Sequence, residues 1–135
     1  SSYDGIVSIN DGSCAYRIMI SPDYHPFYDP GTHNDQNVTD YTFKLGKWYH
    51  YAMTVLGGGD ATIYVDGNAI HTSTAGVPTT LPNGNDVLMG TGEGPGVHPT
   101  QGIIDEVRIY NQALTAAEIQ KHYAEGLERH LSYSR

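Results

Sequence analysis

The densest group of chemically useful side chains in this 135-residue chain lies in residues 21–40, SPDYHPFYDPGTHNDQNVTD. Three aromatic residues, Tyr24, Phe27 and Tyr28, fall close together in this segment, which shows little regular periodicity. Long loops of this kind often carry function, and aromatic rings on a loop can stack against the apolar face of a sugar. We therefore predict that Tyr24, Phe27 and Tyr28 bind a ligand. The alternative is that the same rings pack the loop onto its own sheet.

A second candidate is Asp105, in the segment that begins at Gln101. In a regular strand Asp105 would share one face with Ile103, Val107 and Ile109, so its carboxylate would point toward the core. A buried carboxylate needs a cation, an arginine or several backbone N–H groups. We predict that Asp105 is a metal ligand. A structural partner, or a bulge that turns the side chain outward, is the alternative.

The carboxylates do not match the requirements of a glycosidase, which needs two of them on either side of the scissile bond. Asp105 and Glu106 are adjacent, so in a strand they point to opposite faces, and Glu93 lies in a separate Gly/Pro-rich loop. No nucleophile elbow, phosphate-binding loop or zinc signature occurs in the sequence. We predict that the protein is not an enzyme.

Short strands are the elements that must position these side chains. The chain has 16 glycines and 7 prolines without a repeat, which suits many short strands joined by tight turns. Asp66-Gly67 is a hairpin turn signal. The alternation of side chains predicts strands over Ser1–Ile9, Ala15–Ile20, Pro26–Tyr28, Tyr41–Leu45, Lys47–Leu56, Ala61–Val65, Ala69–Thr74, Asp86–Gly90 and the segment after Gln101. Trp48, in the fifth of these strands, is expected to anchor the core.

One helix is predicted near the C-terminus. Thr115 and Glu118 have the spacing of a capping box, and Leu114 with Ile119 has the spacing of a hydrophobic staple. Gly126 is the expected end of the helix. Residues 127–135 are then expected to form a frayed tail.

Charge and hydropathy exclude two classes of partner. The formal net charge is -8, and binding to nucleic acid requires a basic surface. The sequence has no run of 18 apolar residues, so we predict no membrane span.

Three motifs, taken together, resemble the laminin-G-like domains of the concanavalin-A-like jelly-roll superfamily. They are GIIDEVRIYNQALTAAEI at Gly102–Ile119, GKWYH followed by YAMTV at Gly46–Val55, and the hairpin IYVDGNAI at Ile63–Ile70. The resemblance implies an all-β fold over residues 1–126, a two-sheet antiparallel β-sandwich (jelly roll) with one short C-terminal helix. It also implies an extracellular or cell-surface location, and calcium as the ion for a site at Asp105.

Family domains usually carry further strands before the point that corresponds to residue 1, so we expect either that this sequence is an excerpt of a longer protein or that other segments replace those strands. An open sheet edge is a template for pairing, which makes a homo-oligomer or an added partner strand conceivable. We predict a non-catalytic extracellular module for glycan binding or adhesion, with a polysaccharide or glycan as partner. The alternative is a protein-interaction or self-assembling β-sandwich domain, and the third hypothesis is a glycoside hydrolase or its remnant.

Overall fold

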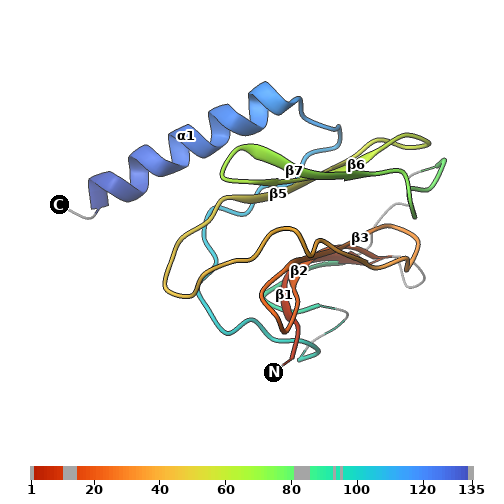
Figure 1. Ribbon diagram of the computed structural model, residues 1–135, viewed down its shortest axis with the longest axis horizontal. Helices are drawn as coiled ribbons and strands as arrows, with labels where there is room; N and C mark the ends of the chain where they lie inside the picture. The colour runs from red at the N-terminus through yellow and green to blue at the C-terminus, as the bar shows by residue number, and fades with distance from the viewer. Residues whose placement is uncertain (1, 11–14, 81–85, 93, 95, 134–135) are drawn as a thin grey trace.

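The computed structural model describes residues 2–10, 15–80, 86–92, 94 and 96–133 (Figure 1). Within these residues the chain forms eight strands followed by one helix. They are β1 (Asp4–Asn10), β2 (Ala15–Ile20), β3 (Pro26–Pro30), β4 (Gln36–Asn37), β5 (Tyr51–Val55), β6 (Ala61–Val65), β7 (Asn68–Ser73), β8 (Asp86–Met89) and α1 (Ala116–Tyr133).

The strands form two antiparallel sheets that face each other (Figure 1). The larger sheet has the strand order β4-β3-β2-β1-β8, and the smaller has the order β5-β6-β7. The predicted two-sheet antiparallel β-sandwich is therefore confirmed. Helix α1 lies over the outer side of the smaller sheet, and its C-terminal half extends past the sheet (Figure 1).

The core lies between the two sheets and follows the alternation of the strands. Ala61 and Ile63 of β6 point inward and pack with Tyr28 of β3 and with Val38. The hydroxyl of Tyr51 donates hydrogen bonds across the core to the backbone oxygens of Met19 (3.2 Å) and Phe27 (3.3 Å). Burial raises the pKa of Tyr51, so the hydroxyl stays protonated and the two sheets stay joined through it.

The Asp66-Gly67 hairpin turn is confirmed. Both residues have a positive φ, 50° and 77°, as a tight turn between β6 and β7 requires. Gly67 also lies against α1, because a Cβ added there would come within 3.1 Å of the ring of Tyr123. The turn thus sets both the register of the hairpin and the approach of the helix.

The predicted capping box of α1 is confirmed. The backbone N–H of Thr115 donates to the Glu118 carboxylate (2.7 Å), and the N–H of Glu118 donates back to the Thr115 hydroxyl (3.3 Å). The predicted end at Gly126 is wrong, because the helix continues to Tyr133, so most of the expected tail is helical. Arg129, beyond Gly126, lies 2.8 Å from Glu106, a contact that supports the added turns.

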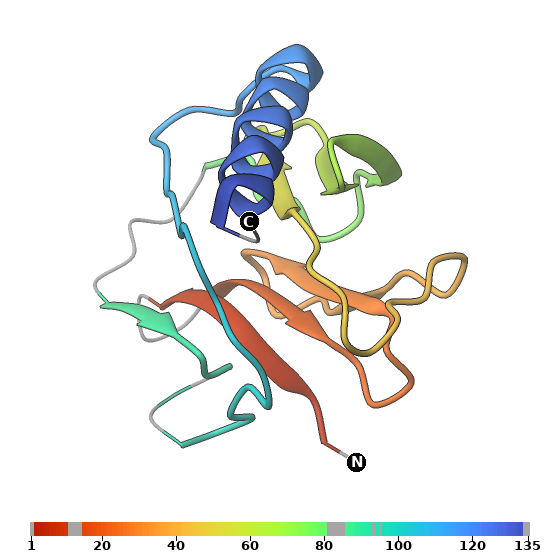
Figure 2. The same cartoon turned by 90° about the vertical axis from the view of Figure 1, so that its left-hand side faces the viewer.

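The strand predicted after Gln101 is not formed, and neither is the one predicted over Tyr41–Leu45. Glu106 adopts a left-handed φ of 51°, which breaks the alternation on which the first prediction depended. Ile103 is 79% exposed instead of facing the core. Residues 101–112 run as one stretched segment from the larger sheet toward the start of α1 (Figure 2).

The described residues that follow β8, 91, 92, 94 and 96–100, lie over the outer side of the larger sheet at β1 and β2 (Figures 1 and 2). The N–H of Gly5 donates to the backbone oxygen of His98 (2.9 Å). Gly5 must be glycine here, because a Cβ would lie 2.1 Å from the backbone nitrogen of Gly92. The loop buries Met19, which would otherwise face solvent.

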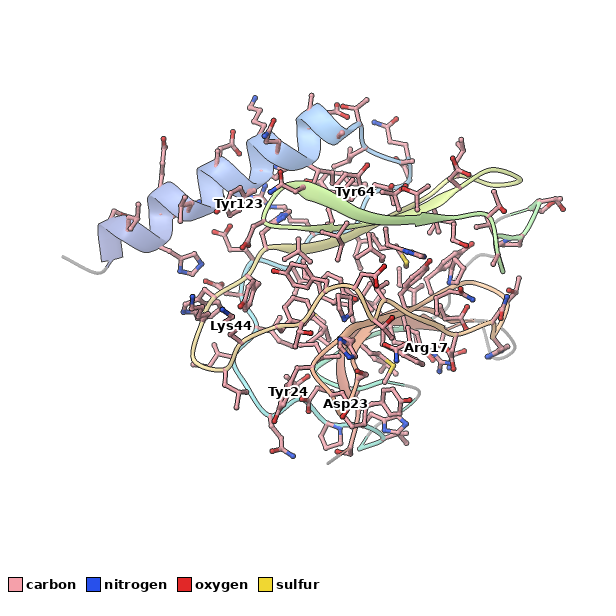
Figure 3. All side chains as sticks on the ribbon, viewed as in Figure 1. Arg17, Asp23, Tyr24, Lys44, Tyr64 and Tyr123 are labelled. Atoms are coloured by element: carbon pink, nitrogen blue, oxygen red, sulfur yellow. The ribbon has the colours of Figure 1, made fainter. Side chains whose placement is uncertain are left out.

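A buried charge cluster lies around Arg17, which is labelled in Figure 3 and points to the same outer side of the larger sheet. Arg17 and Asp29 are paired across β2 and β3 and are almost fully buried, with 3.6 Å between Nη2 and Oδ2. Arg17 Nη2 also lies 2.7 Å from Asp35 Oδ1. Asp29 Oδ1 accepts hydrogen bonds from the N–H groups of Gly31 and Thr32. The cluster therefore fixes the turn after β3 to the sheet.

Among the described residues, no helix combines the length and the apolar composition that crossing a bilayer requires.

Candidate functional site

Tyr24 projects from a tight turn at one end of the sandwich (Figure 3). The Tyr24 N–H donates to the Ser21 oxygen, and the Ser21 N–H donates to the His25 oxygen, both at 2.9 Å. Tyr24 itself has a φ of 65°, a conformation that a bulky residue seldom adopts. The turn holds the ring outward, and the side chain is exposed.

The loop of residues 41–49 lies directly beside this turn. The Phe43 N–H donates to the Tyr24 oxygen at 2.8 Å, and His25 Nδ1 lies 2.8 Å from the Tyr41 oxygen. The ring of Phe43 is buried and contacts Tyr49, with 5.0 Å between the centroids. Further ring contacts within this cluster join Phe43 to Tyr41 and Tyr51. A packed aromatic base thus supports a loop whose outer side chains face solvent.

Trp48 is 53% exposed on this loop, so the prediction that it anchors the core is wrong. Its ring lies against His130 from the C-terminal part of α1, with 4.9 Å between the centroids and 31° between the planes. Leu45 is also exposed on the loop. Two of the three lysines of the chain, Lys44 and Lys47, flank these apolar side chains. We call residues 21–25 together with residues 41–49 the aromatic rim.

The three aromatic residues predicted to bind a ligand lie in three different places. Tyr24 is on the aromatic rim. Phe27 is half-buried on the outer side of the larger sheet, where its ring contacts Tyr3 at 4.6 Å. Tyr28 is fully buried in the core, so it cannot contact a ligand in this structure, and burial raises the pKa of its hydroxyl. Because Phe27 and Tyr28 are neighbours in β3, they must point to opposite faces.

Asp105 is exposed and is engaged by neighbouring groups. Its Oδ1 accepts a hydrogen bond from the Glu106 N–H (2.8 Å), and its Oδ2 lies 3.9 Å from His130 Nε2. Glu106 pairs with Arg129 at 2.8 Å and with Arg108 at 3.7 Å. Since these two carboxylates are held by cationic or titratable side chains, they do not form an acid–base pair on either side of an open site. Glu93 lies outside the described residues.

The side chains around Asp105 do not fit calcium. Calcium takes six to eight oxygen ligands, usually including several carboxylates. Among the described residues no group of three or more His, Cys, Asp or Glu side chains is arranged to hold a metal ion. Calcium at Asp105 stays a prediction from the sequence.

A chelator experiment tests that prediction. Because the partners of the Asp105 carboxylate among the described residues are a backbone N–H and His130, we expect EDTA to leave the melting temperature unchanged, both in the wild type and in Asp105→Asn. A melting temperature that falls with EDTA in the wild type but not in Asp105→Asn would establish the metal site instead.

His50 lies between the aromatic rim and α1. Its N–H donates to Asp66 Oδ1 at 2.9 Å, and its ring lies 6.1 Å from that of Tyr123. His50 Nδ1 is buried and has no hydrogen-bond partner in the described part of the chain. Burial lowers the pKa of His50 below its ordinary value of 6.5, and the charges of His122 and Arg108 add to this, while Asp66 opposes it.

This lowered pKa predicts a loss of stability in acid. Below about pH 6.5 the unfolded chain takes up a proton at His50 that the folded chain does not, so the free energy of unfolding falls as the pH falls. We expect urea unfolding between about pH 8 and pH 5 to show a steeper decline for the wild type than for His50→Gln. His33→Asn, at an exposed histidine, is the control and should keep the wild-type slope. Equal slopes for the wild type and His50→Gln would contradict the assignment.

Comparisons with known proteins agree with this fold. The laminin G-type sequence profile of the concanavalin A-like lectin/glucanases superfamily matches residues 1–120. No curated protein sequence gives a significant match. The structure is similar to that of residues 221–444 of an S-layer domain-containing protein from Clostridium thermocellum, with a TM-score of 0.50 and 19% identity over 90% of this chain. The chain spans 63% of the length of that protein's solved chain, and the likeness shows the fold alone.

Proposed function

The chain belongs to the concanavalin A-like lectin/glucanases superfamily, and we propose that it is a non-catalytic extracellular module that binds glycans or mediates adhesion. The aromatic rim is the proposed binding surface. In this proposal the module works outside the cell or at its surface, as the superfamily name and the lectin-type fold suggest for a binding domain.

The exposure of Trp48 is the observation that carries the proposal. A large aromatic side chain that is half exposed on a well-anchored loop presents a flat apolar face, and sugars offer a matching face of C–H groups. Tyr24 supplies a second exposed ring on the adjacent turn, and its hydroxyl can exchange hydrogen bonds with sugar hydroxyls. Lys44 and Lys47 add donors beside Trp48.

The charge pairing of Asp105 and Glu106 supports a non-catalytic role. A glycosidase acid must hold a proton near neutral pH, and its partner must act as a base or nucleophile. Glu106 instead pairs with two arginines, at 2.8 Å from Arg129 and 3.7 Å from Arg108. The two acidic side chains are therefore better explained by the docking of α1 than by hydrolysis.

A glycan array followed by affinity electrophoresis in polysaccharide gels tests the proposal. We expect the wild type to be retarded by at least one polysaccharide, and Trp48→Ala and Tyr24→Ala each to weaken binding by about tenfold, because a stacked ring contributes on the order of 1 kcal/mol. The control is Leu56→Ala, which removes an exposed apolar side chain just past the opposite end of β5.

Binding that survives both rim substitutions would contradict the assignment of the rim. Absence of binding to every glycan on the array would contradict the proposed function itself.

A second candidate function is protein interaction. The observation that favours it is the exposure of the aliphatic side chains of Val87 and Met89 on β8.

A further inference from the structure

Helix α1 continues beyond the smaller sheet although no core lies beneath its last turns. Ile119, in the first turns, is buried, whereas Leu127 and Leu131 in the last turns are exposed. Figure 1 shows the C-terminal half of α1 extending past the edge of the sheet. Gly126 weakens the helix at the same place, because glycine loses more backbone entropy than other residues when it becomes helical. The turns after Gly126 are therefore not explained by burial of apolar side chains.

The last turns of α1 are held instead by contacts with the stretched segment of residues 101–112. Arg129 Nη1 lies 2.8 Å from Glu106 Oε1, within hydrogen-bond distance. His130, the next residue, has its Nε2 3.9 Å from Oδ2 of Asp105, the carboxylate that precedes Glu106. Because Arg129 and His130 are about 100° apart around the helix axis, the two contacts together fix the rotation of these turns. This rotation brings the ring of His130 to the aromatic rim.

Trp48 meets the ring of His130 on the rim. The two ring centroids are 4.9 Å apart and the planes are inclined by 31°, so the rings lie against each other at a shallow angle. Among the described residues this is the single ring contact of Trp48, which stands on a loop after Gly46 and is 53% exposed. An aromatic ring has two faces, so a neighbour on one face leaves the opposite face for a ligand.

We propose that His130 positions Trp48 for glycan binding, which makes the last turns of α1 a part of the binding surface. The inference deepens the proposed function and rests on it. A tryptophan on a loop can adopt several rotamers, and a sugar that stacks on it must overcome the entropy of fixing one of them. His130 holds the indole in place beforehand, so this entropic cost does not weaken the binding of the sugar.

The carboxylates of Asp105 and Glu106 have a role in this arrangement without touching a ligand. They contact Arg129 and His130, and His130 in turn supports Trp48. Three segments that are distant in sequence therefore act together: residues 41–49, residues 105–106 and the end of α1. A change in residues 105–106 reaches the rim through the helix.

The ring of His130, rather than its charge, is the feature that supports Trp48. The 3.9 Å separation from Asp105 is too long for a hydrogen bond, whereas the ring contact with Trp48 is close. His130→Phe keeps a flat ring at this position and removes the contact with Asp105. His130→Ala and His130→Gln remove the ring and keep the helix, since alanine and glutamine are both good helix formers. These three variants separate the ring from the helix that carries it.

The first measurement uses fluorescence of the full chain, which reports on Trp48 alone because the chain has 1 tryptophan. We expect the acrylamide quenching constant to rise by about 1.5- to 2-fold in His130→Ala and in His130→Gln, because the second face of the indole becomes accessible. His130→Phe should keep the wild-type value. Leu131→Ala, at the neighbouring exposed position of α1, is the control and should keep it as well.

The second measurement is affinity electrophoresis of the same variants in gels of hydroxyethyl cellulose, laminarin, xylan and galactomannan. In a gel that retards the wild type, His130→Ala and His130→Gln should bind about three- to tenfold more weakly, as expected when the sugar must immobilise one more side chain. His130→Phe and Leu131→Ala should bind within about twofold of the wild type. A wild type that binds only a glycan of the array is compared with the variants on that glycan.

The outcomes distinguish this inference from the proposed function. A wild type that binds none of these polysaccharides and no glycan of the array overturns both. If the wild type binds, equal binding by His130→Ala, or binding by His130→Phe as weak as that by His130→Ala, overturns the role of His130 and leaves the proposed function standing. An unchanged acrylamide quenching constant in His130→Ala overturns that role as well.

Discussion

Replacing Arg17 by methionine is expected to lower the free energy of unfolding by about 3–5 kcal/mol, because it leaves a buried carboxylate without its cation. Asp29 is fully buried beside Arg17, and its Oδ2 has no other hydrogen-bond partner among the described residues. Methionine fills a similar volume, so the loss reflects charge rather than a cavity. Urea unfolding followed by fluorescence measures it.

The control for Arg17→Met is Asp35→Asn. Asp35 also contacts Arg17, but it is largely exposed, so its substitution should cost less than about 1 kcal/mol. The double variant Arg17→Met, Asp29→Asn removes both buried charges, keeps an oxygen that can accept the hydrogen bonds of the Gly31 and Thr32 N–H groups, and should recover much of the lost stability. Equal losses from Arg17→Met and Asp35→Asn would show that the buried pair is not what stabilises the turn after β3.

Replacing Tyr28 by alanine is expected to lower the free energy of unfolding by about 3–5 kcal/mol through the cavity it leaves. Tyr28 is among the largest fully buried side chains and packs with Val38, Ala61 and Ile63. Thermal unfolding monitored by circular dichroism measures the loss. Any loss of ligand binding in this variant would follow from unfolding and would carry no information about a binding surface.

Tyr24→Ala is the matched control for Tyr28→Ala. The two tyrosines are close in sequence, but Tyr24 is exposed on the aromatic rim, so its removal should change the free energy of unfolding by less than about 0.5 kcal/mol. If Tyr28→Ala were as stable as Tyr24→Ala, the inner face of β3 would not form the core described above.

The sheets and the start of the helix could be predicted from sequence because local patterns decide them. The β6–β7 hairpin follows from Asp66-Gly67, two residues that readily adopt the positive φ values that a two-residue type I′ hairpin turn requires. The helix start follows from Thr115 and Glu118, which satisfy each other's backbone donors whatever lies nearby. The end of the helix could not be predicted in the same way, since contacts of Arg129 and His130 with distant residues carry it past Gly126.

The candidate site was predicted less well because exposure depends on which strands form. The short strand predicted over Pro26–Tyr28 does form as part of β3, but its alternation sends the ring of Phe27 outward and that of Tyr28 into the core, so the two rings cannot share one binding surface. Trp48 was predicted to lie in a strand over Lys47–Leu56 and to be buried. That strand begins at Tyr51, so Trp48 lies on the preceding loop and is exposed. Gly46, with a φ of 74°, is the local signal that the loop turns before Trp48.

Asp105 could not be placed from alternation alone. The alternation assigned Asp105 to the core face of a strand, but Glu106 has a positive φ and no strand pairs with this segment among the described residues, so Asp105 lies in solvent. A sequence pattern can predict which residues share a face, but not whether a neighbouring strand is present to cover that face.

β1 pairs with a strand that is near it in sequence and with one that is distant, and this has a consequence for how the protein folds during synthesis. β1 pairs with β2, which follows it directly in the sequence. Its other neighbour is β8, and the N–H of Gly5 bonds to the oxygen of His98, so these contacts form only after much more of the chain has been made. During synthesis on the ribosome one side of the β1–β2 hairpin therefore stays unpaired until residues 86–98 have emerged. Such a high contact order slows folding, and the nascent hairpin is then exposed to aggregation for longer than in a domain built from sequential neighbours.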